Sequence, residues 1–125
     1  MSDQAELLKK RTMRFALDIC ALIRQFPAWE PGPTAQRQLA KAATSVAFNY
    51  RASCRARSHA EFTAKIGTVA EEADESLGWL EFAEAAPLAD GPELARLLAE
   101  SRELCAIFSA SVGTARYNRR NPPQS

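Results

Sequence analysis

The sequence predicts an all-α fold, an antiparallel up-down-up-down four-helix bundle, from three observations. Residues that favour helices, above all Ala, Leu, Glu and Arg, dominate the 125-residue chain, and glycine occurs only 5 times. Helix-breaking or capping residues gather at residues 27–33, 57–58 and 87–92, and the four segments between these breaks carry apolar residues at helical spacing. Short connections make consecutive helices antiparallel neighbours. We therefore expect one bundle over residues 1–118 and a flexible C-terminal tail over residues 119–125.

The first two helices are expected over residues 4–26 and 34–56. At 100° per residue, one face of the first helix collects large apolar side chains, namely Leu8, Phe15, Ile19, Leu22, Ile23 and Phe26. The corresponding face of the second helix is narrow and allows close packing, with Leu39, Ala43, Val46, Tyr50 and Ser53. Each helix therefore has one face that can be buried in a shared core.

The third helix is expected to begin at Ser58, in the capping box Ser58-His59-Ala60-Glu61. A capping residue leaves helical geometry, so we expect the chain to reverse here rather than continue as one kinked rod. The fourth helix is expected near Asp90, with Glu93 three residues on as a further capping signal. The predicted core faces of these two helices are Phe62, Ile66, Val69, Ala73, Leu77 and Leu80, then Leu94, Leu97, Ser101, Leu104, Phe108, Val112 and Ala115.

The residue sets that build most catalytic and metal sites are missing from the sequence. His59 is the only histidine, and the pair Glu72 and Glu75 lacks the histidine that a di-metal site in a helical bundle requires. No glycine-rich phosphate loop is present. We therefore expect no enzyme activity, no metal and no cofactor.

Cysteine usage and hydropathy predict a cytoplasmic protein. Cys20, Cys54 and Cys105 lie far apart in apolar helical patterns, which is typical of free thiols in a reducing compartment. Residues 1–14 are polar and charged, unlike a signal peptide. No apolar run approaches the roughly 18–20 residues that a membrane span needs, so we expect no membrane association.

Positive charge gathers at one end of the predicted bundle, although the net charge of the chain is only +1. This end combines the start of the first helix, the end of the second and the end of the fourth. Helix dipoles explain some of these cations, because positive charge is favoured at helix C-termini. A phosphate backbone is the natural ligand of such an end, since Lys and Arg gain affinity by releasing counterions. The predicted nucleic-acid-binding residues are Lys9, Lys10, Arg11, Arg51, Arg55, Arg57, Arg116, Arg119 and Arg120.

Large apolar side chains also occur away from the predicted core faces, on stripes that a monomeric bundle would keep polar. Two aromatic residues of the third helix stand out, because they share one such stripe. Asn49, Glu72 and Glu75 add a polar set that either pairs between helices or subunits or forms an ordinary solvated face. The predicted homo-oligomer interface comprises Met13, Leu17, Phe48, Asn49, Glu72, Glu75, Trp79 and Phe82.

Ordered residue types across both middle helices carry a family resemblance. They are TSVAFNYR at residues 44–51, RARS at 55–58, EF at 61–62, KIG at 65–67, EADES at 72–76 and WLE at 79–81. From about residue 11 to residue 115 the chain resembles the four-helix bundle protein family, known for proteins encoded in intervening sequences of bacterial large-subunit ribosomal RNA genes. The resemblance implies an antiparallel bundle and a homo-oligomer, typically a pentamer, without an established activity.

One branch of that family resembles the accessory variability determinant of diversity-generating retroelements, whose basic pentameric barrels bind nucleic acid and a reverse transcriptase. The net charge of +1 here is low for that branch. The sequence also departs from the family pattern at Ala52, where Glu is usual, and at Glu71, where Lys is frequent. The change at Ala52 removes a partner for Arg55 or Arg57.

Two functional hypotheses follow from these features. In the first, a nucleic-acid-associated accessory protein binds RNA or DNA through the basic end. In the second, an oligomeric scaffold or adaptor recruits a protein partner through its apolar stripes or its acidic half.

Overall fold

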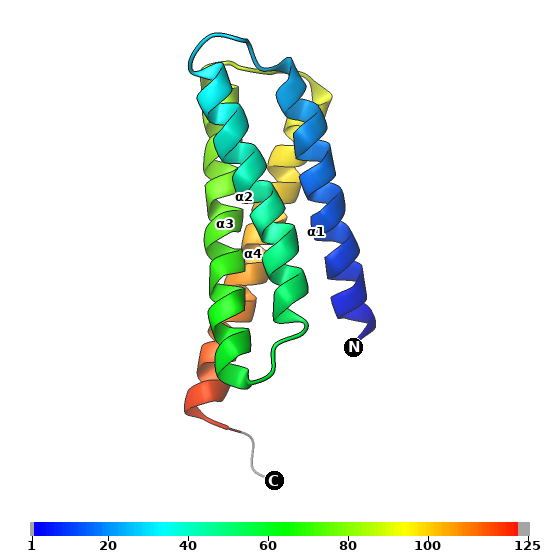
Figure 1. Cartoon of the computed structure of the whole chain (residues 1–125), viewed down its shortest axis with the longest axis vertical. Helices are drawn as coiled ribbons and strands as arrows, with labels where there is room; N and C mark the ends of the chain where they lie inside the picture. The colour runs from blue at the N-terminus through cyan, green and yellow to red at the C-terminus, as the bar shows by residue number, and fades with distance from the viewer. Residues whose placement is uncertain (1, 123–125) are drawn as a thin grey trace.

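The computed structural model describes residues 2–122, and the described part of the chain forms a bundle of four long helices (Figure 1). The helices run up, down, up and down, and α1 is followed by a short 3₁₀ turn, Ile23–Gln25. Each helix packs on its neighbours in the chain, and α1 also meets α4 through a smaller contact that closes the ring of helices. The predicted all-α antiparallel bundle is confirmed. The helices are α1 (Asp3–Leu22), α2 (Gly32–Ser53), α3 (His59–Ala85) and α4 (Pro92–Arg120).

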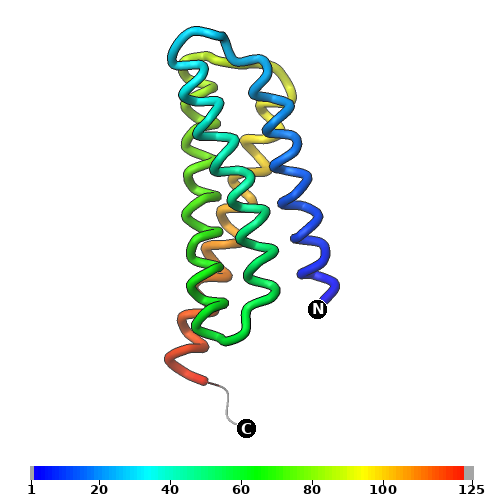
Figure 2. The backbone as a smooth tube through the Cα atoms, viewed as in Figure 1, coloured from blue at the N-terminus to red at the C-terminus, as the bar shows by residue number. Residues whose placement is uncertain are grey.

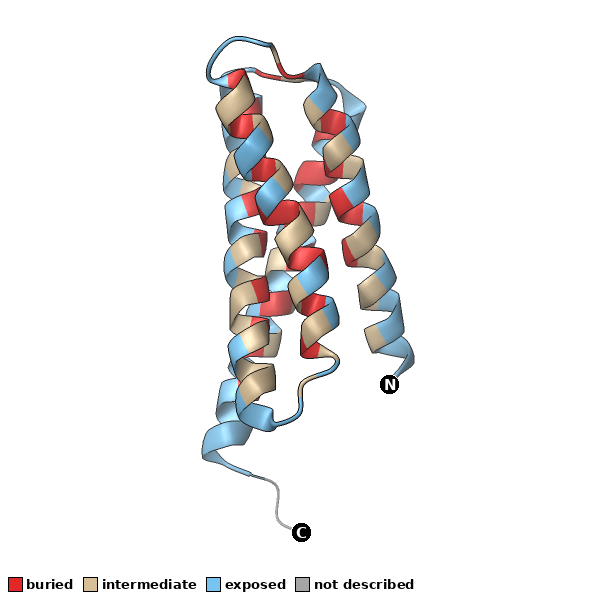
Figure 3. Cartoon of the chain, viewed as in Figure 1, coloured by how far each residue is buried: buried red, intermediate tan, exposed pale blue. Residues whose placement is uncertain are grey.

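The core lies along the bundle axis, where the buried stripe of every helix turns inward (Figure 3). The predicted faces of α2 and α4 are buried along their whole length. On α1 and α3 the predicted faces are buried in the middle, whereas Leu8, Phe62 and Leu77 are half-buried against the same core. Helical periodicity therefore identified the core correctly, because the apolar stripe of each helix is buried only when it faces the other helices.

Serine side chains cap two helices. The Ser2 hydroxyl accepts a hydrogen bond from the amide of Ala5 at 3.1 Å, and the Ser58 hydroxyl accepts one from the amide of Glu61 at 3.0 Å. Ser58 is extended, with φ −151°, and the chain reverses between α2 and α3 within residues 54–58. The predicted reversal is confirmed. The Glu61 carboxylate lies 3.6 Å from Arg57, an ion pair that the capping box did not anticipate.

The cap and the end of α4 differ from the prediction. The helix starts at Pro92, two residues after Asp90, and Gly91 is its N-cap residue, with φ 93° and no side-chain hydrogen bond. Pro92 has no N–H that would need a cap, and glycine readily adopts the positive φ that leads into the helix. At the other end the helix includes Arg119 and Arg120, which we expected in the tail. Residues 123–125 of that predicted tail lie outside the described residues.

The connection between α1 and α2 depends on close backbone packing at Gly32. A Cβ atom at this position would overlap the carbonyl oxygen of Pro27. The Glu30 carboxylate accepts hydrogen bonds at 3.0 Å from the Thr34 amide and from the Thr34 hydroxyl, and these bonds lower the pKa of Glu30. The first turn of α2 is therefore held by the preceding loop.

Ion pairs join α1 to α4 where the bundle closes. The Arg11 guanidinium binds Glu100 through Nε at 2.8 Å and Nη2 at 2.6 Å, and Nη2 also lies 3.1 Å from Glu103. Nearer the other end, Arg96 binds Asp18 at 2.8 Å. These contacts are partly exposed, so each contributes about 1 kcal/mol or less. They fix the register of α1 against α4 along a seam where the two helices contact each other little.

The substitution Gly32→Ala should destabilise the fold by about 1–3 kcal/mol, because the added methyl group must displace the loop carbonyl of Pro27. Chemical denaturation would measure the change. Gly113→Ala is the matched control, because a Cβ at this position of α4 meets nothing within 4 Å. That control should stabilise the protein by up to about 1 kcal/mol. An unchanged stability for Gly32→Ala would contradict the close approach.

Candidate nucleic-acid interface

The last turns of α4 project beyond the rest of the bundle (Figure 2). At the start of α3, His59 Nε2 lies 2.9 Å from the carbonyl oxygen of Ala115, which joins the two helices at the point where the projection begins. Beyond this point α4 carries Arg116, Arg119 and Arg120 and no acidic residue. The projection is therefore a basic arm attached to the end of the bundle.

A groove of about 670 Å³ runs between this arm and the first half of α3. The three arginines line one side, and Thr63, Ala64, Gly67, Thr68 and Glu71 line the other. None of these arginines makes an ion pair with any residue between 2 and 122. Glu71 is the single acidic residue in the lining, so the groove as a whole is positive.

The connection between α2 and α3 adds two exposed cations at the same end of the bundle. Arg57 is paired with Glu61, but 90% of its side chain remains accessible. Arg55 is exposed and makes no ion pair within the described part of the chain. We call these two residues and the three arginines of the arm the end cluster, which comprises Arg55, Arg57, Arg116, Arg119 and Arg120.

The other predicted phosphate ligands lie elsewhere. The prediction that Arg11 is a phosphate ligand is corrected. Its guanidinium binds Glu100 and Glu103, and the hydrogen bond to Glu100 raises its pKa. Arg11 therefore stabilises the contact between α1 and α4. Lys9, Lys10 and Arg51 line a separate groove on the side of the bundle. Helical periodicity predicted that these residues lie near one end of the bundle. It did not predict that their side chains lie on the side of the bundle formed by α1 and α2, away from the basic arm.

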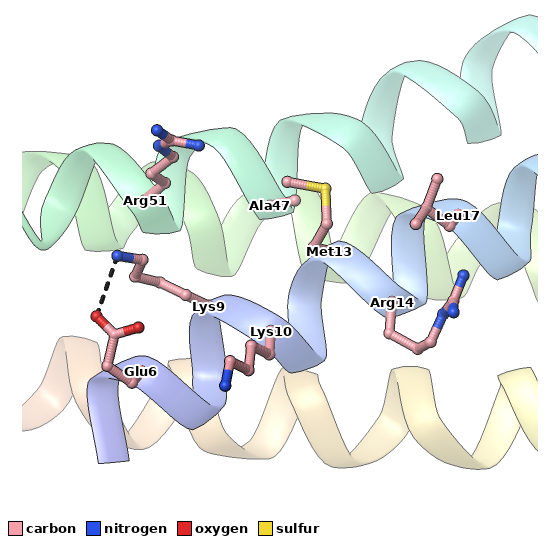
Figure 4. Close-up of a pocket in the computed structure, with 8 residues that line it drawn as sticks. All are labelled: Glu6, Lys9, Lys10, Met13, Arg14, Leu17, Ala47 and Arg51. Carbon is pink, nitrogen blue, oxygen red and sulfur yellow. Dashed lines mark hydrogen bonds and ion pairs between the residues drawn. The ribbon is translucent and has the colours of Figure 1, made fainter. Parts of the chain in front are cut away.

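The side groove lies between α1 and α2 and has a volume of about 350 Å³ (Figure 4). Met13, Leu17 and Ala47 provide its apolar surface, and Met13 points toward Ala47 across the two helices. Its charged margin contains Lys10, Arg14 and Arg51, together with Lys9, which binds Glu6 at 3.2 Å. Arg14, one turn from Lys10 on the same helix, was counted among the cations of the basic end but not among the predicted nucleic-acid-binding residues.

The predicted interface residues differ in exposure. Leu17, Phe48 and Phe82 are 52%, 58% and 42% exposed, which is high for large apolar side chains. The prediction that Trp79 lies on a stripe away from the core is corrected, because Trp79 is half-buried and packs against the core. Its ring lies 5.4 Å from that of Phe82 in an edge-on arrangement. Asn49 is also satisfied internally, since its amide donates to the carbonyl and the hydroxyl of Ser45.

Glu72 is half-buried on α3 and makes no ion pair with a described residue. Burial raises the pKa of Glu72, the neighbouring Glu75 and Glu71 raise it further, and Lys41 on α2 lowers it. Neither Glu72 nor Glu75 makes an ion pair with another helix within residues 2–122, so both a contact between subunits and a solvated face stay open for this polar set.

The described helices contain no apolar stretch long enough to span a membrane. Residues 2–122 also contain no group of three or more His, Cys, Asp and Glu side chains arranged to hold a metal ion.

The substitution Glu72→Gln should raise the free energy of unfolding at pH 7. A carboxyl group whose pKa is raised by folding stabilises the native state only while it is protonated, and this stability is lost as the pH rises through the folded pKa. The difference between Glu72→Gln and the parent protein should therefore vanish below pH 4.5, the ordinary glutamate value. Urea titrations at pH 4 and pH 7 would measure it. A difference that is independent of pH would show that burial does not penalise this carboxylate.

Comparison with known proteins agrees with this architecture. The family model described as 23S rRNA-intervening sequence protein matches residues 6–110, so the match ends before the basic arm. A crystal structure from Bacteroides thetaiotaomicron VPI-5482, a protein of unknown function from the S23 ribosomal protein family, has the same fold. Its TM-score is 0.75 at 22% identity, over 83% of this chain and 96% of the other. No curated protein matches the sequence. Because the family model covers most of the bundle, this chain belongs to the 23S rRNA-intervening sequence protein family.

Proposed function

We propose that this protein is a non-enzymatic, cytoplasmic accessory protein that binds a nucleic-acid backbone through the end cluster. The observation that carries the proposal is the groove between α3 and the basic arm, where Arg116, Arg119 and Arg120 face solvent without an ion pair among the described residues. Guanidinium groups suit this role, because each can donate two parallel hydrogen bonds to phosphate oxygens.

The shape of the groove supports binding to a backbone. Ala64 and Gly67 are small residues on the α3 side, so a strand can approach the helix closely. Tyr117, which is 64% exposed on the projecting arm, offers a ring on which a base can stack. The α4 dipole accounts for one or two cations in the last turn. It leaves unexplained why five arginines collect at one end of a chain with a net charge of +1.

The family description favours RNA as the first ligand to test. It refers to a 23S rRNA-intervening sequence. A structured hairpin RNA is therefore the appropriate probe, and a DNA duplex of the same length is the comparison.

An oligomeric scaffold for a protein partner is the second candidate function. The observation that favours it is the exposure of Leu17, Phe48 and Phe82 on three different helices. Exposed side chains of this size on a small bundle are typical of a contact surface. Self-association would use such a surface and is compatible with the first candidate, because the end cluster lies at the end of the bundle rather than on its sides.

The test is the charge reversal Arg116→Glu with Arg120→Glu, assayed by filter binding to hairpin RNA. With three to five phosphate contacts, the parent affinity should fall by about 40- to 500-fold between 50 mM and 200 mM salt. The variant should bind more weakly at low salt, and its log–log salt slope should be smaller by about two, one for each lost phosphate contact.

Arg24→Glu with Arg102→Glu is the matched control, because it makes the same change in net charge at exposed positions far from the arm. This control should bind almost as the parent protein does. The proposal fails if the parent protein does not bind hairpin RNA at low salt, or if both double variants lose affinity equally.

A further inference from the structure

The groove between α3 and the basic arm has two walls with opposite hydrogen-bonding character. The side of the groove on α4, which we call the arm wall, comprises Arg116, Arg119 and Arg120. A guanidinium group has five N–H donors and no acceptor, so the arm wall only donates. The opposite side, which we call the α3 wall, comprises Thr63, Ala64, Gly67, Thr68 and Glu71.

The threonine hydroxyl groups of the α3 wall already use their protons within the helix. Thr63 Oγ1 donates to the carbonyl oxygen of His59 at 2.9 Å, and Thr68 Oγ1 donates to the carbonyl oxygen of Ala64 at 3.3 Å. A hydroxyl group has one proton and two lone pairs, so each of these oxygens can still accept a hydrogen bond. Toward a ligand in the groove, both threonines therefore act as acceptors.

The rest of the α3 wall adds an acceptor and no donor. Ala64 and Gly67 have no polar side-chain atom, and every residue of the wall lies beyond the first four residues of the helix that begins at His59. Their amide protons are therefore used in the helix itself. Glu71 is exposed and forms no ion pair within residues 2–122, and an ionised carboxylate only accepts.

Phosphate binding alone does not explain why Glu71 lines a groove of arginines. A carboxylate repels phosphate oxygens, so Glu71 weakens the attraction of the arm wall for a ligand whose only polar groups are phosphates. A ligand that donates a hydrogen bond to Glu71 offsets this repulsion, since hydrogen bonds to charged groups are among the strongest in proteins. The groove therefore favours a ligand with phosphates along one edge and donors along the other.

The backbone of RNA has this combination of groups. Each nucleotide carries a phosphate and a 2′-hydroxyl group that can donate, and proteins recognise RNA helices through 2′-hydroxyl and phosphate contacts across the minor groove. The sugar-phosphate backbone of DNA lacks the 2′-hydroxyl and so has no hydrogen-bond donor. The two walls therefore match the backbone of RNA and not that of DNA.

We propose that the α3 wall accepts hydrogen bonds from the 2′-hydroxyl groups of RNA while the arm wall binds the phosphates. Glu71 is the charged acceptor, and Thr63 and Thr68 are the neutral ones. Glu71 thus determines specificity in two ways, because it binds the hydroxyl group of RNA and repels a backbone that lacks one. The proposal rests on the proposed function and adds the class of nucleic acid and the residues that select it.

Filter binding with two matched hairpins tests the role of Glu71. The first hairpin is RNA, and in the second every 2′-hydroxyl is replaced by fluorine, which removes the donor and keeps the phosphates and bases. The parent protein should prefer the RNA hairpin by about 20-fold, with about 10-fold from one hydrogen bond to a charged group and the rest from neutral ones. In Glu71→Ala the preference should fall to about 2-fold.

Two further variants separate charge from hydrogen bonding. Glu84→Ala is the matched control, because it removes the same charge from an exposed position of α3 outside the groove, and it should keep the parent preference. Thr63→Val with Thr68→Val removes the neutral acceptors without a change of charge. This double variant should reduce the preference for the RNA hairpin to about 10-fold.

The outcomes distinguish this inference from the proposed function. A parent protein that binds the two hairpins equally would overturn the inference and leave phosphate binding by the end cluster intact. If Glu71→Ala changes the affinity for both hairpins by the same factor, Glu71 acts on phosphates alone and the inference is again wrong. A parent protein that binds neither hairpin at low salt would remove the proposed function, and this inference with it.

Discussion

The hydrogen bond that caps α3 at Ser58 determines where the chain reverses between the two middle helices. The Ser58 hydroxyl satisfies the amide of Glu61, and the extended backbone at Ser58 cannot continue α2 as a single rod. The reversal brings the end of α2, the start of α3 and the end of α4 together. The cationic end of this protein depends on that arrangement.

Closure of the bundle uses part of the positive charge. Arg11 and Arg96 bind carboxylates across the α1–α4 seam, where the two helices contact each other less than the other neighbouring pairs do. Charge at these positions therefore stabilises the fold and is not available to a ligand. The exposed arginines of the end cluster differ from them because they project beyond the region that α1 covers.

The remaining cations divide between two surfaces with different chemistry. The three arginines of the arm line a polar groove with small residues, and such a surface suits a phosphate backbone. The side groove combines Lys10, Arg14 and Arg51 with Met13 and Leu17, and an apolar centre with a charged margin suits a protein surface. An oligomer assembled through the sides would leave the end cluster of each copy free, so the two proposed contacts do not compete.

The sequence by itself determined the four helices, their order and their buried faces, because helical periodicity and the cap at Ser58 are local properties of the chain. It also indicated that cations gather at one end. Only the tertiary structure decided that Arg11 pairs with Glu100, that Trp79 packs against the core, and that Lys10 and Arg51 share a groove with Arg14 rather than with the basic arm. These outcomes depend on the rotation of each helix about its own axis and on contacts between residues far apart in the chain, and neither is encoded in local spacing.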